Sequence, residues 1–556
     1  MPATHTVINQ PPPLQGYDVY AADAVLREAV HREGADWAEE ELGRLGRLAG
    51  SAEAIAWGVA ANRAVPELRT HDRYGARIDE VAFHPAYHDL LGTAVAHGLH
   101  AAPWAGPDSS GAHVARAAGF VVWSQVDAGV GCPVSMTYAS VPVLRERPDV
   151  ATGWLPAVTS RSYDPGLRPV ASKPGALVGM AMTEKQGGSD VRANTTLATP
   201  DAGGSYLLTG HKWFCSAPMS DAFLVLARAP GGLSCFLLPR ILPEGDRNAI
   251  HLQRLKDKLG NRSNASAEIE LDGALADLVG EEGRGVATIA RMVALTRLDC
   301  VLGTAALLRQ GAAQALHHTQ HRAAFGRPLA DQPLMRNVLT DLALESEAAT
   351  TLGLRLAGAV DRSGSDGAEA DLLRIGTALG KYLVCKRGPG VLAEALECLG
   401  GNGYVEESIM PRLYREAPVN SVWEGSGNVN ALDVLRALHR SPATADALLA
   451  EVDLARGGDT RFDAFAGRVA EDVRAALAAP PDEAEWGARS LVVRLTLALQ
   501  AALLVRHAPA AVADAFCAAR LAPEAGAGAT LGTLPAGVDA TAIIERHLPH
   551  AAVVAA

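Results

Sequence analysis

The segment SVWEGSGN, residues 421–428, holds a single carboxylate, Glu424, between a tryptophan and a glycine. The segment contains no second acid, no histidine and no cysteine. Glu424 is therefore either a catalytic base that works without an acidic partner or an ordinary solvated glutamate in a turn. The other segments of the chain must decide between these two interpretations.

Two segments nearer the N-terminus have residue types suited to binding a flat ligand. In MTEKQGGSD (182–190) a predicted strand ends at Thr183, and two glycines allow the backbone to approach such a ligand closely. In GHKWFCSA (210–217) two aromatic residues precede a small residue and a hydroxyl. The alternatives are a polar turn, in which Thr183 and Ser189 only cap the backbone, and a core strand with two aromatic side chains.

Several other kinds of site are not expected. The chain has no Rossmann or P-loop glycine fingerprint, no HExxH and no GxSxG. Its seven cysteines form no CxxC pair and are odd in number, which argues against a disulfide framework or a zinc site. Reduced thiols of this kind are typical of a cytoplasmic protein, and we expect no metal.

Seven segments, taken in order, resemble the acyl-CoA dehydrogenase superfamily. They are MTEKQGGSD, GHKWFCSA, KLGNRSN (258–264), TRLD (296–299), HRAAFGRPL (321–329), LGGNGY (399–404) and YREAPVNSVWEGSGN (414–428). THTVINQPPPL near the N-terminus, RLKDKLGNRSNAS and the extra C-terminal section are similar to the AidB branch, flavoproteins of the adaptive response to DNA alkylation. This narrower match runs from the first dozen residues to about residue 436.

The resemblance implies an FAD site between the middle and last domains. Met182 and Thr183 would face the isoalloxazine edge and Ser189 the pyrophosphate, and Phe214, Cys215 and Ser216 would line one flavin face. An arginine at the end of a helix would reach the pyrophosphate of a neighbouring subunit's FAD, unless it is simply solvated there. The implied cofactor-binding residues are Met182, Thr183, Gly188, Ser189, Phe214, Cys215, Ser216, Arg322, Phe325, Gly400, Gly401, Trp423, Ser426 and Asn428.

The same resemblance assigns a role to Glu424. Members of the superfamily remove the α-proton of an acyl thioester with one base while the β-hydride passes to flavin N5, so no acidic partner is needed. The isovaleryl-type branch carries its base one residue before an arginine, and that position here is Thr296, before Arg297. Any proton abstraction therefore rests on Glu424. Arg262 would shape the loop at the substrate site.

Three functions remain open at this point. The first is an AidB-type FAD flavoprotein that protects DNA and has weak activity on isovaleryl-CoA-like substrates. The second is a fully active acyl-CoA dehydrogenase that passes electrons to an electron-transfer flavoprotein. The third is a flavin-stabilised, DNA-binding or oligomeric scaffold without catalysis. The resemblance also implies a homotetramer, a dimer of dimers, because the cofactor site would be shared across subunits.

The elements that must position these residues follow from the pattern of apolar residues. The spacing is helical up to about residue 172, with predicted helices over 24–50 and 111–133, the second ending at Pro133. Short β-branched runs separated by turns predict a small antiparallel β-domain. We therefore expect a mostly α, α+β fold of acyl-CoA dehydrogenase type. Its parts are an extended arm (1–17), a helical domain (18–174), a β-barrel domain (175–282), a four-helix bundle (283–440) and an extra helical domain (441–556).

Composition limits the partners. The chain has 556 residues, of which 48% are hydrophobic, and a formal net charge of −12, which argues against indiscriminate binding of nucleic acid. The section from 441 onwards has nine arginines against fourteen acidic residues. Double-stranded DNA would need some of these arginines on one face, with Arg489, Arg494 and Arg506 as candidates; the alternative is a packing or oligomerisation domain. No run of about 18 unbroken apolar residues predicts a membrane span.

Overall fold

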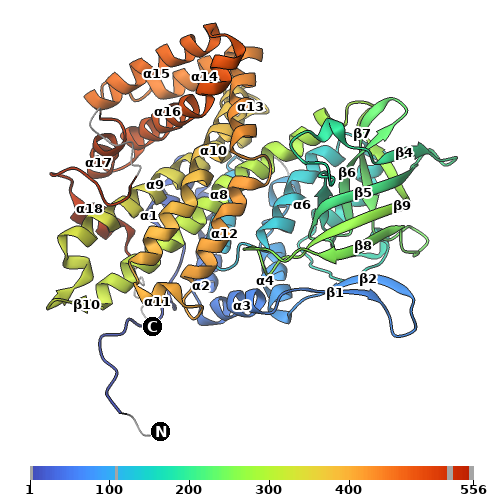
Figure 1. Ribbon diagram of the computed structural model, residues 1–556, viewed down its shortest axis with the longest axis horizontal. Helices are drawn as coiled ribbons and strands as arrows, with labels where there is room; N and C mark the ends of the chain where they lie inside the picture. Colours follow the sequence, from blue (N-terminus) through green and yellow to red (C-terminus); the bar gives the residue numbers. More distant parts are fainter. Residues whose placement is uncertain (1–3, 107–109, 523–529, 550–556) are drawn as a thin grey trace. The chain divides into compact units, whose positions relative to one another are not determined.

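The computed structural model describes residues 4–106, 110–522 and 530–549, and the contacts divide the chain into two compact units (Figure 1). The first unit comprises residues 1–52, 113–125 and 300–556, and the second comprises 53–112 and 126–299. The predicted fold class is confirmed, since the structure is largely helical and includes one β-barrel. The five domains predicted from the sequence stay a prediction, and the predicted domain 18–174 has segments in both units.

The second unit contains the barrel, several α-helices and the N-terminal part of α8 (Gly285–His321). Its α-helices are α3 (Ala52–Arg63), α4 (Pro85–Ala96), α6 (Gly131–Leu144) and α7 (Pro148–Val158), with 3-10 turns at Ala102–Trp104, Val170–Ser172 and Val191–Ala193. A hairpin of β1 (Glu67–His71) and β2 (Arg77–Ala82) interrupts the region predicted to be mostly helical. The large sheet consists of β3 (Val178–Ala181), β4 (Leu197–Pro200), β5 (Tyr206–Ser216), β6 (Ala222–Ala229), β7 (Gly232–Pro239), β8 (Ile250–Leu255) and β9 (Ser266–Val279).

The pairing of these strands closes a barrel. The strand order is β3-β6-β4-β5-β9-β7, and β6 also pairs with β7, so the ring closes at β6. Strand β3 adds to β6, and β8 adds to β9. Most pairs are antiparallel, as predicted, but β3 and β4 each pair with β6 in parallel. A closed ring leaves few unpaired strand edges, and alternate side chains along each strand point into a common interior.

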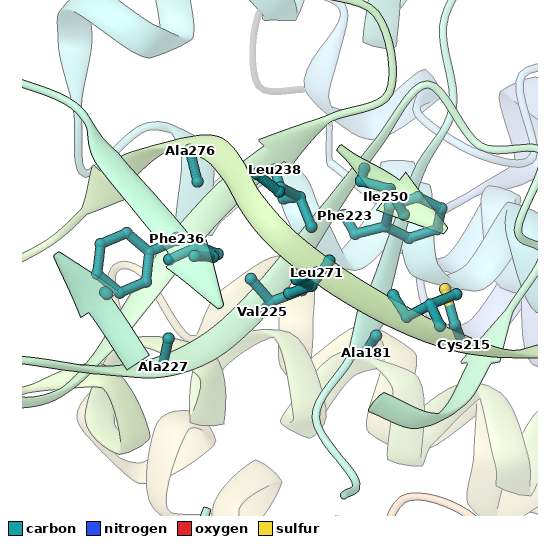
Figure 2. Packing of buried hydrophobic residues seen from close by; sticks show 14 of the residues in the cluster. Ala181, Cys215, Phe223, Val225, Ala227, Phe236, Leu238, Ile250, Leu271 and Ala276 are labelled. Atoms are coloured by element: carbon teal, nitrogen blue, oxygen red, sulfur yellow. The ribbon is translucent and has the colours of Figure 1, made fainter. Parts of the chain in front are cut away.

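A dense apolar cluster fills the barrel. Phe223, Val225, Phe236 and Leu238 come from the β6–β7 pair, and Leu271 from β9 meets them inside (Figure 2). Each of these side chains is at most 2% exposed. At roughly 25 cal/mol per Å² of apolar surface removed from water, burial of this kind is the main force that holds the strands in register.

The first unit is helical. Its elements are α1 (Ala24–Arg32), a 3-10 turn (Asp36–Ala38), α2 (Glu39–Ala49), α5 (Ala112–Ser124), most of α8 (Gly285–His321), β10 (Ala323–Ala324), β11 (Arg327–Pro328), a 3-10 turn (Leu329–Asp331), α9 (Pro333–Arg362), α10 (Gly367–Glu397), α11 (Gly401–Tyr404), α12 (Met410–Val422), α13 (Gly427–Arg440), α14 (Pro442–Asp453), α15 (Thr460–Ala478), α16 (Pro481–His507), α17 (Ala510–Arg520) and α18 (Ala540–His547). Helix α10 packs against α9, α12, α13, α14 and α16 and is the centre of this unit.

Two helix predictions were wrong in their boundaries. The region predicted as one helix over 24–50 breaks at Gly34, whose φ of 81° ends α1 before α2 begins. The helix predicted to end at Pro133 ends at Ser124, and Pro133 lies in the first turn of α6. Proline is compatible with a first turn because the N–H it lacks would have no intrahelical acceptor there.

The C-terminal helices are joined to α9 by buried ion pairs. Each pair links a residue of α9 to a residue beyond position 441, at N–O distances of 2.8 or 2.9 Å: Arg355 with Glu451, Glu345 with Arg520, and Glu347 with His547. Among the described residues, α16 alone is long and apolar enough to cross a membrane. Since 72% of its most apolar 18-residue window is buried in the protein, packing accounts for its composition.

Candidate flavin and acyl-CoA site

The predicted flavin residues fall into both units, and each group is held by contacts within its own unit. In the second unit, the loop after β3 is held in place by Glu184, whose side chain has no exposed surface. Glu184 accepts hydrogen bonds from Lys212 Nζ at 2.8 Å and from the Thr196 hydroxyl at 2.6 Å. Burial alone would raise the pKa of Glu184, but these donors and Thr195 outweigh it and hold the pKa well below its usual range.

This anchor presents the residues predicted to face the isoalloxazine and the pyrophosphate. Met182 and Thr183 are half-buried, and their carbonyl oxygens accept from Asn194 Nδ2 and from a backbone N–H, both at 2.8 Å. A Cβ at Gly188 would lie 2.5 Å from Thr183 Oγ1, so any larger residue would have to displace the Thr183 side chain. Ser189 is exposed, one residue further along. The loop is therefore held by hydrogen bonds at Met182 and Thr183, next to β3, and is exposed at Ser189.

Strand β5 carries a β-bulge that turns two aromatic rings to one side. Two residues, Trp213 and Phe214, stand opposite the single residue Glu268 of β9, while their neighbours on β5 pair in register. Lys256 Nζ lies 3.3 Å from the centroid of Trp213 and 4.7 Å from that of Phe214, which is 47% exposed. The bulge thus presents a partly exposed Phe214 beside an ammonium group.

The assignment of Cys215 to the flavin face was wrong for its side chain. Cys215 points into the barrel, has no exposed surface and packs in the apolar cluster (Figure 2). Burial raises the pKa of its thiol to about 12. The bulge explains the error, because it places Phe214 outside the barrel and Cys215 inside.

Ser216 is the half-buried end of a polar chain. Its hydroxyl lies 3.3 Å from Ser266 Oγ, which accepts from Lys258 Nζ at 3.1 Å. Lys258 also donates to the Asn264 carbonyl at 2.7 Å. This chain links strand β5 to the loop that carries Arg262, a half-buried residue predicted to shape the substrate site.

In the first unit, Glu424 sits in a strained turn between α12 and α13. Its φ is 58°, a left-handed conformation that costs a non-glycine residue about 1–2 kcal/mol. The buried Lys381 of α10 donates to the carbonyls of Asn420 at 2.6 Å and Gly425 at 3.2 Å, one on each side of Glu424. Asn430 Nδ2 also donates to the Gly425 carbonyl, at 2.6 Å. Glu424 itself is half-buried.

The neighbours of Glu424 are oriented by the same turn. Trp423 is half-buried, and its indole N–H donates to Asn420 Oδ1 at 3.1 Å. Ser426 occupies the N-cap of α13 without a side-chain capping bond, and Asn428 follows in the first turn; both are exposed. The turn and the first N–H groups of α13 therefore present hydroxyl, amide and backbone donors together.

Arg322 and Phe325 belong to a small hairpin that follows α8. Phe325 and Gly326 form its two-residue turn, both with positive φ, and Phe325 is 97% exposed. Arg322 donates from its guanidinium to the Asn9 carbonyl at 2.6 Å, and the Asn9 side chain bonds to both backbone groups of Ala323. The extended N-terminal arm is therefore attached to this hairpin.

The glycines of LGGNGY lie next to the same arm. Gly400 has a φ of 58°, and a Cβ at either Gly400 or Gly401 would meet no atom within 4 Å. Asn402 Nδ2 donates to Gln10 Oε1 of the arm at 3.2 Å. The arm thus brings the Arg322 hairpin and this open glycine turn together within the first unit.

The arginines predicted to contact DNA are engaged within the protein. Arg494 Nε lies 2.6 Å from a carboxylate oxygen of Asp472, and an Arg506 guanidinium nitrogen lies 2.7 Å from one of Glu451. Arg489 of α16 donates to an asparagine side chain of α13. These contacts do not favour the three arginines as a free basic surface. Among the described residues, no group of three or more histidine, cysteine or acidic side chains could hold a metal ion.

The sequence did not predict the buried and half-buried residues that hydrogen-bond to the loops and turns of the site. Lys381, Lys258 and the Glu184–Lys212 pair were not predicted, although three of them lie within or next to the motif segments. A buried lysine gives no periodic signal, so only its presence in a motif could have pointed to it. Lys381, on α10, had no such signal.

Comparison with known proteins places the chain in a family. The family model for the N-terminal domain of adaptive response protein AidB matches residues 9–165, and the acyl-CoA dehydrogenase middle and C-terminal domain models match 179–274 and 283–439. The putative acyl-CoA dehydrogenase AidB of Escherichia coli (strain K12) is 47% identical over 94% of this chain and 95% of its own length. The chain belongs to the AidB branch of the acyl-CoA dehydrogenase family.

Solved structures agree with this AidB-type assignment. Caenorhabditis elegans ACDH-11, in complex with C11-CoA, is 26% identical with a TM-score of 0.84 and 93% of each chain covered. An acyl-CoA dehydrogenase from Bacillus anthracis complexed with FAD is 20% identical, with a TM-score of 0.63 over 78% of this chain and 80% of that one. The second likeness shows the fold alone.

FAD is the cofactor of this AidB-type chain, as predicted, and the chain is an FAD-dependent oxidoreductase. The residues present fit the group. In the second unit, Gly188 leaves room over Thr183 that a Cβ would fill, and Phe214 offers a partly exposed ring. In the first unit, a Cβ at Gly400 or Gly401 would meet open space. These features suit a flat ring system with a polar edge and a dinucleotide that approaches the backbone closely.

Proposed function

We propose that Glu424 is the general base that removes the α-proton of an acyl-CoA thioester. The turn around Glu424 carries this proposal, because Lys381 and Asn430 hold it in a left-handed conformation that a merely solvated glutamate would not need. Thr296 occupies the other base position used in the superfamily and cannot accept a proton. The likeness to a protein solved with C11-CoA supports an acyl-CoA substrate.

The chain's own residues have separate tasks in this proposal. The Glu424 carboxylate takes the proton, and the donors on both sides of it fix its direction. When bound, FAD supplies the acceptor for the hydride. The loop anchored by Glu184 and the ring of Phe214 hold and orient the cofactor, and the loop around Arg262 borders the substrate.

The test is anaerobic reduction of the bound flavin by acyl-CoA. Isovaleryl-CoA and a C11 acyl-CoA are mixed with wild type, Glu424→Gln and Glu407→Gln, and the loss of flavin absorbance is followed. Glu407 is an exposed glutamate outside the turn and gives a matched control. General-base removal typically costs about 10²- to 10⁴-fold in rate, so Glu424→Gln should bleach at least 100 times more slowly while Glu407→Gln matches wild type. Equal rates in all three would exclude Glu424 as the base.

The absolute rate separates weak from full dehydrogenase activity. Rates near 10 s⁻¹, a typical enzyme value, together with electron delivery to an electron-transfer flavoprotein, would identify a fully active dehydrogenase. Rates several orders lower would identify residual activity. Retention of FAD with no bleaching in any variant would identify a flavin-stabilised scaffold.

We further propose a role in the adaptive response to alkylation, in the cytoplasm, supported by the similarity to AidB over nearly the whole chain. Survival of a deletion strain under a methylating agent, complemented with wild type or Glu424→Gln, tests whether the response needs catalysis.

Protection of DNA is the narrower part of this proposal. A salt titration of binding to duplex DNA tests it, because phosphate contacts make the affinity fall steeply as the salt concentration rises. An affinity that does not change with salt would exclude DNA as a partner.

A homotetramer is the assembly that we propose. Large apolar side chains at the hairpin, the arm, α11 and the first turn of α9 are largely exposed in one chain: Phe325 97%, Leu334 85%, Tyr404 81%, Ile8 76% and Val7 70%. Exposed aromatic and aliphatic groups of this size commonly mark interfaces. Light scattering should give four times the chain mass, and Phe325→Ser should shift it to smaller species.

A further inference from the structure

A contact between α16 and α13 links the appended C-terminal section to the predicted cofactor residues. Arg489 Nε donates to Asn428 Oδ1 at 2.8 Å across 61 positions of sequence. The two helices pack against each other within the first unit. Arg489 had been a candidate for DNA contact and Asn428 a candidate for cofactor binding, and the structure makes them partners.

The direction of this bond decides what Asn428 can offer. A side-chain amide has an oxygen that accepts and an NH₂ that donates, and it can be turned by 180° with little change in shape. A guanidinium only donates, so Arg489 fixes the oxygen of Asn428 on its own side and turns the NH₂ away. Asn428 is thereby held as a donor in the first turn of α13, two residues after Ser426.

The surroundings of this turn suit an anionic ligand. A Cβ at Gly427 would lie 3.3 Å from Lys386 Nζ, so a second cation lies against the same turn. The N–H groups of the first turn add the positive end of the helix dipole. Glu424 is the acid nearest in sequence, and it lies outside α13, two residues before the N-cap. A dinucleotide diphosphate is a ligand of this class.

We propose that Arg489 is a positioning residue for the FAD site and acts by orienting Asn428. The inference rests on the proposed function, since it takes Asn428 as part of the flavin site. The appended section then has a task within the enzyme, which is to complete cofactor binding from outside the residues that the dehydrogenase family models match. Arg489 contacts the cofactor residue and not the reacting atoms.

The experiment measures FAD affinity of the apoprotein by quenching of flavin fluorescence. The variants are Arg489→Gln, Asn428→Ala and the double variant, with Arg474→Gln as control. Arg474 is an exposed arginine of the same section whose Nε donates to the Ala470 carbonyl of its own helix at 3.3 Å. Circular dichroism and melting of each apoprotein show whether the section stays folded.

The expected result is a Kd for FAD that rises about 3- to 10-fold in Arg489→Gln, which is the size of one ordinary hydrogen bond. Asn428→Ala should lose as much, and the double variant no more than either single one, because the two residues act as a unit. Arg474→Gln should match wild type. A Kd for Arg489→Gln within twofold of wild type, or additive losses in the double variant, would overturn the inference while leaving the proposed function intact. Wild-type protein that binds no FAD would instead defeat the proposed function, and the inference with it.

Discussion

Replacing Lys381 with methionine tests whether the strained turn is needed for catalysis. Methionine has similar length and flexibility but no charge, so the substitution removes the ammonium and keeps most of the packing. In wild type, Lys381 is 1% exposed and donates to the carbonyls of Asn420 and Gly425. After the change, Gly425 keeps its bond from Asn430, but the Asn420 carbonyl near the end of α12 loses its side-chain donor.

The magnitude follows from these contacts. One buried carbonyl left without its donor costs about 1–3 kcal/mol, which is the expected fall in the free energy of unfolding. The left-handed conformation of Glu424 costs about 1–2 kcal/mol, so losing a restraint of that size lets the turn relax in most molecules. Because 1.4 kcal/mol corresponds to a factor of ten, the rate of flavin reduction should fall about tenfold.

The assay is the anaerobic reduction of flavin by acyl-CoA over a range of substrate concentrations. We expect Lys381→Met to lower the limiting rate about tenfold with little change in the half-saturating concentration, since the base and not the binding surface is displaced. Arg374→Met is the control on the same helix, because Arg374 pairs with Asp433 at the surface and does not touch the turn. A folded Lys381→Met variant that reduces its flavin at the wild-type rate would refute the reasoning.

Three further predictions concern the supports of the fold. Glu184→Gln should lower the free energy of unfolding by about 3–5 kcal/mol in denaturant titrations, because Lys212 is left charged inside the barrel; adding Lys212→Met should recover much of the loss. Burial and Arg322 lower the pKa of His318 to about 4, so the folded protein keeps this ring neutral. Its contribution to stability should be complete above pH 6.5 and be lost as the pH falls from 6.5 towards 4. In His318→Gln, the melting temperature should therefore change less with pH over that range than in wild type. All seven cysteines are buried and free, so a thiol reagent should label almost none in the native protein and seven in denaturant, whereas rapid native labelling would contradict the burial of Cys215.

The sequence predicted the parts of the site that local residue types determine. Thr183, Gly188 and Glu424 stand in short motifs whose spacing is independent of the rest of the chain, and the structure gives each of them a definite local geometry. The barrel strands were recognisable because β-branched runs alternate with turns. A one-residue irregularity escaped this reasoning, since the bulge at Trp213 reverses the side on which Cys215 lies.

Contacts between distant segments could not be predicted. Lys381 reaches the turn of Glu424 across 39 and 44 positions, and Arg489 reaches Asn428 across 61. No pattern in one sequence indicates which of fifty basic residues will face a given carbonyl or amide. The choice depends on how helices cross, and helix crossing is set by the fit of many side chains together.

The ion pairs on α9 have a consequence for how this chain could have arisen. Glu345, Glu347 and Arg355 are buried by helices that lie beyond residue 441. An ancestor that ended at the bundle would have left Glu347 without Arg546 and His547, its partners in α18, whereas Glu345 and Arg355 would have kept Arg387 and Glu369 within the bundle. The carboxylate at position 347 and the basic residues of α18 are therefore matched, and a change of one without the other would bury an unpaired charge.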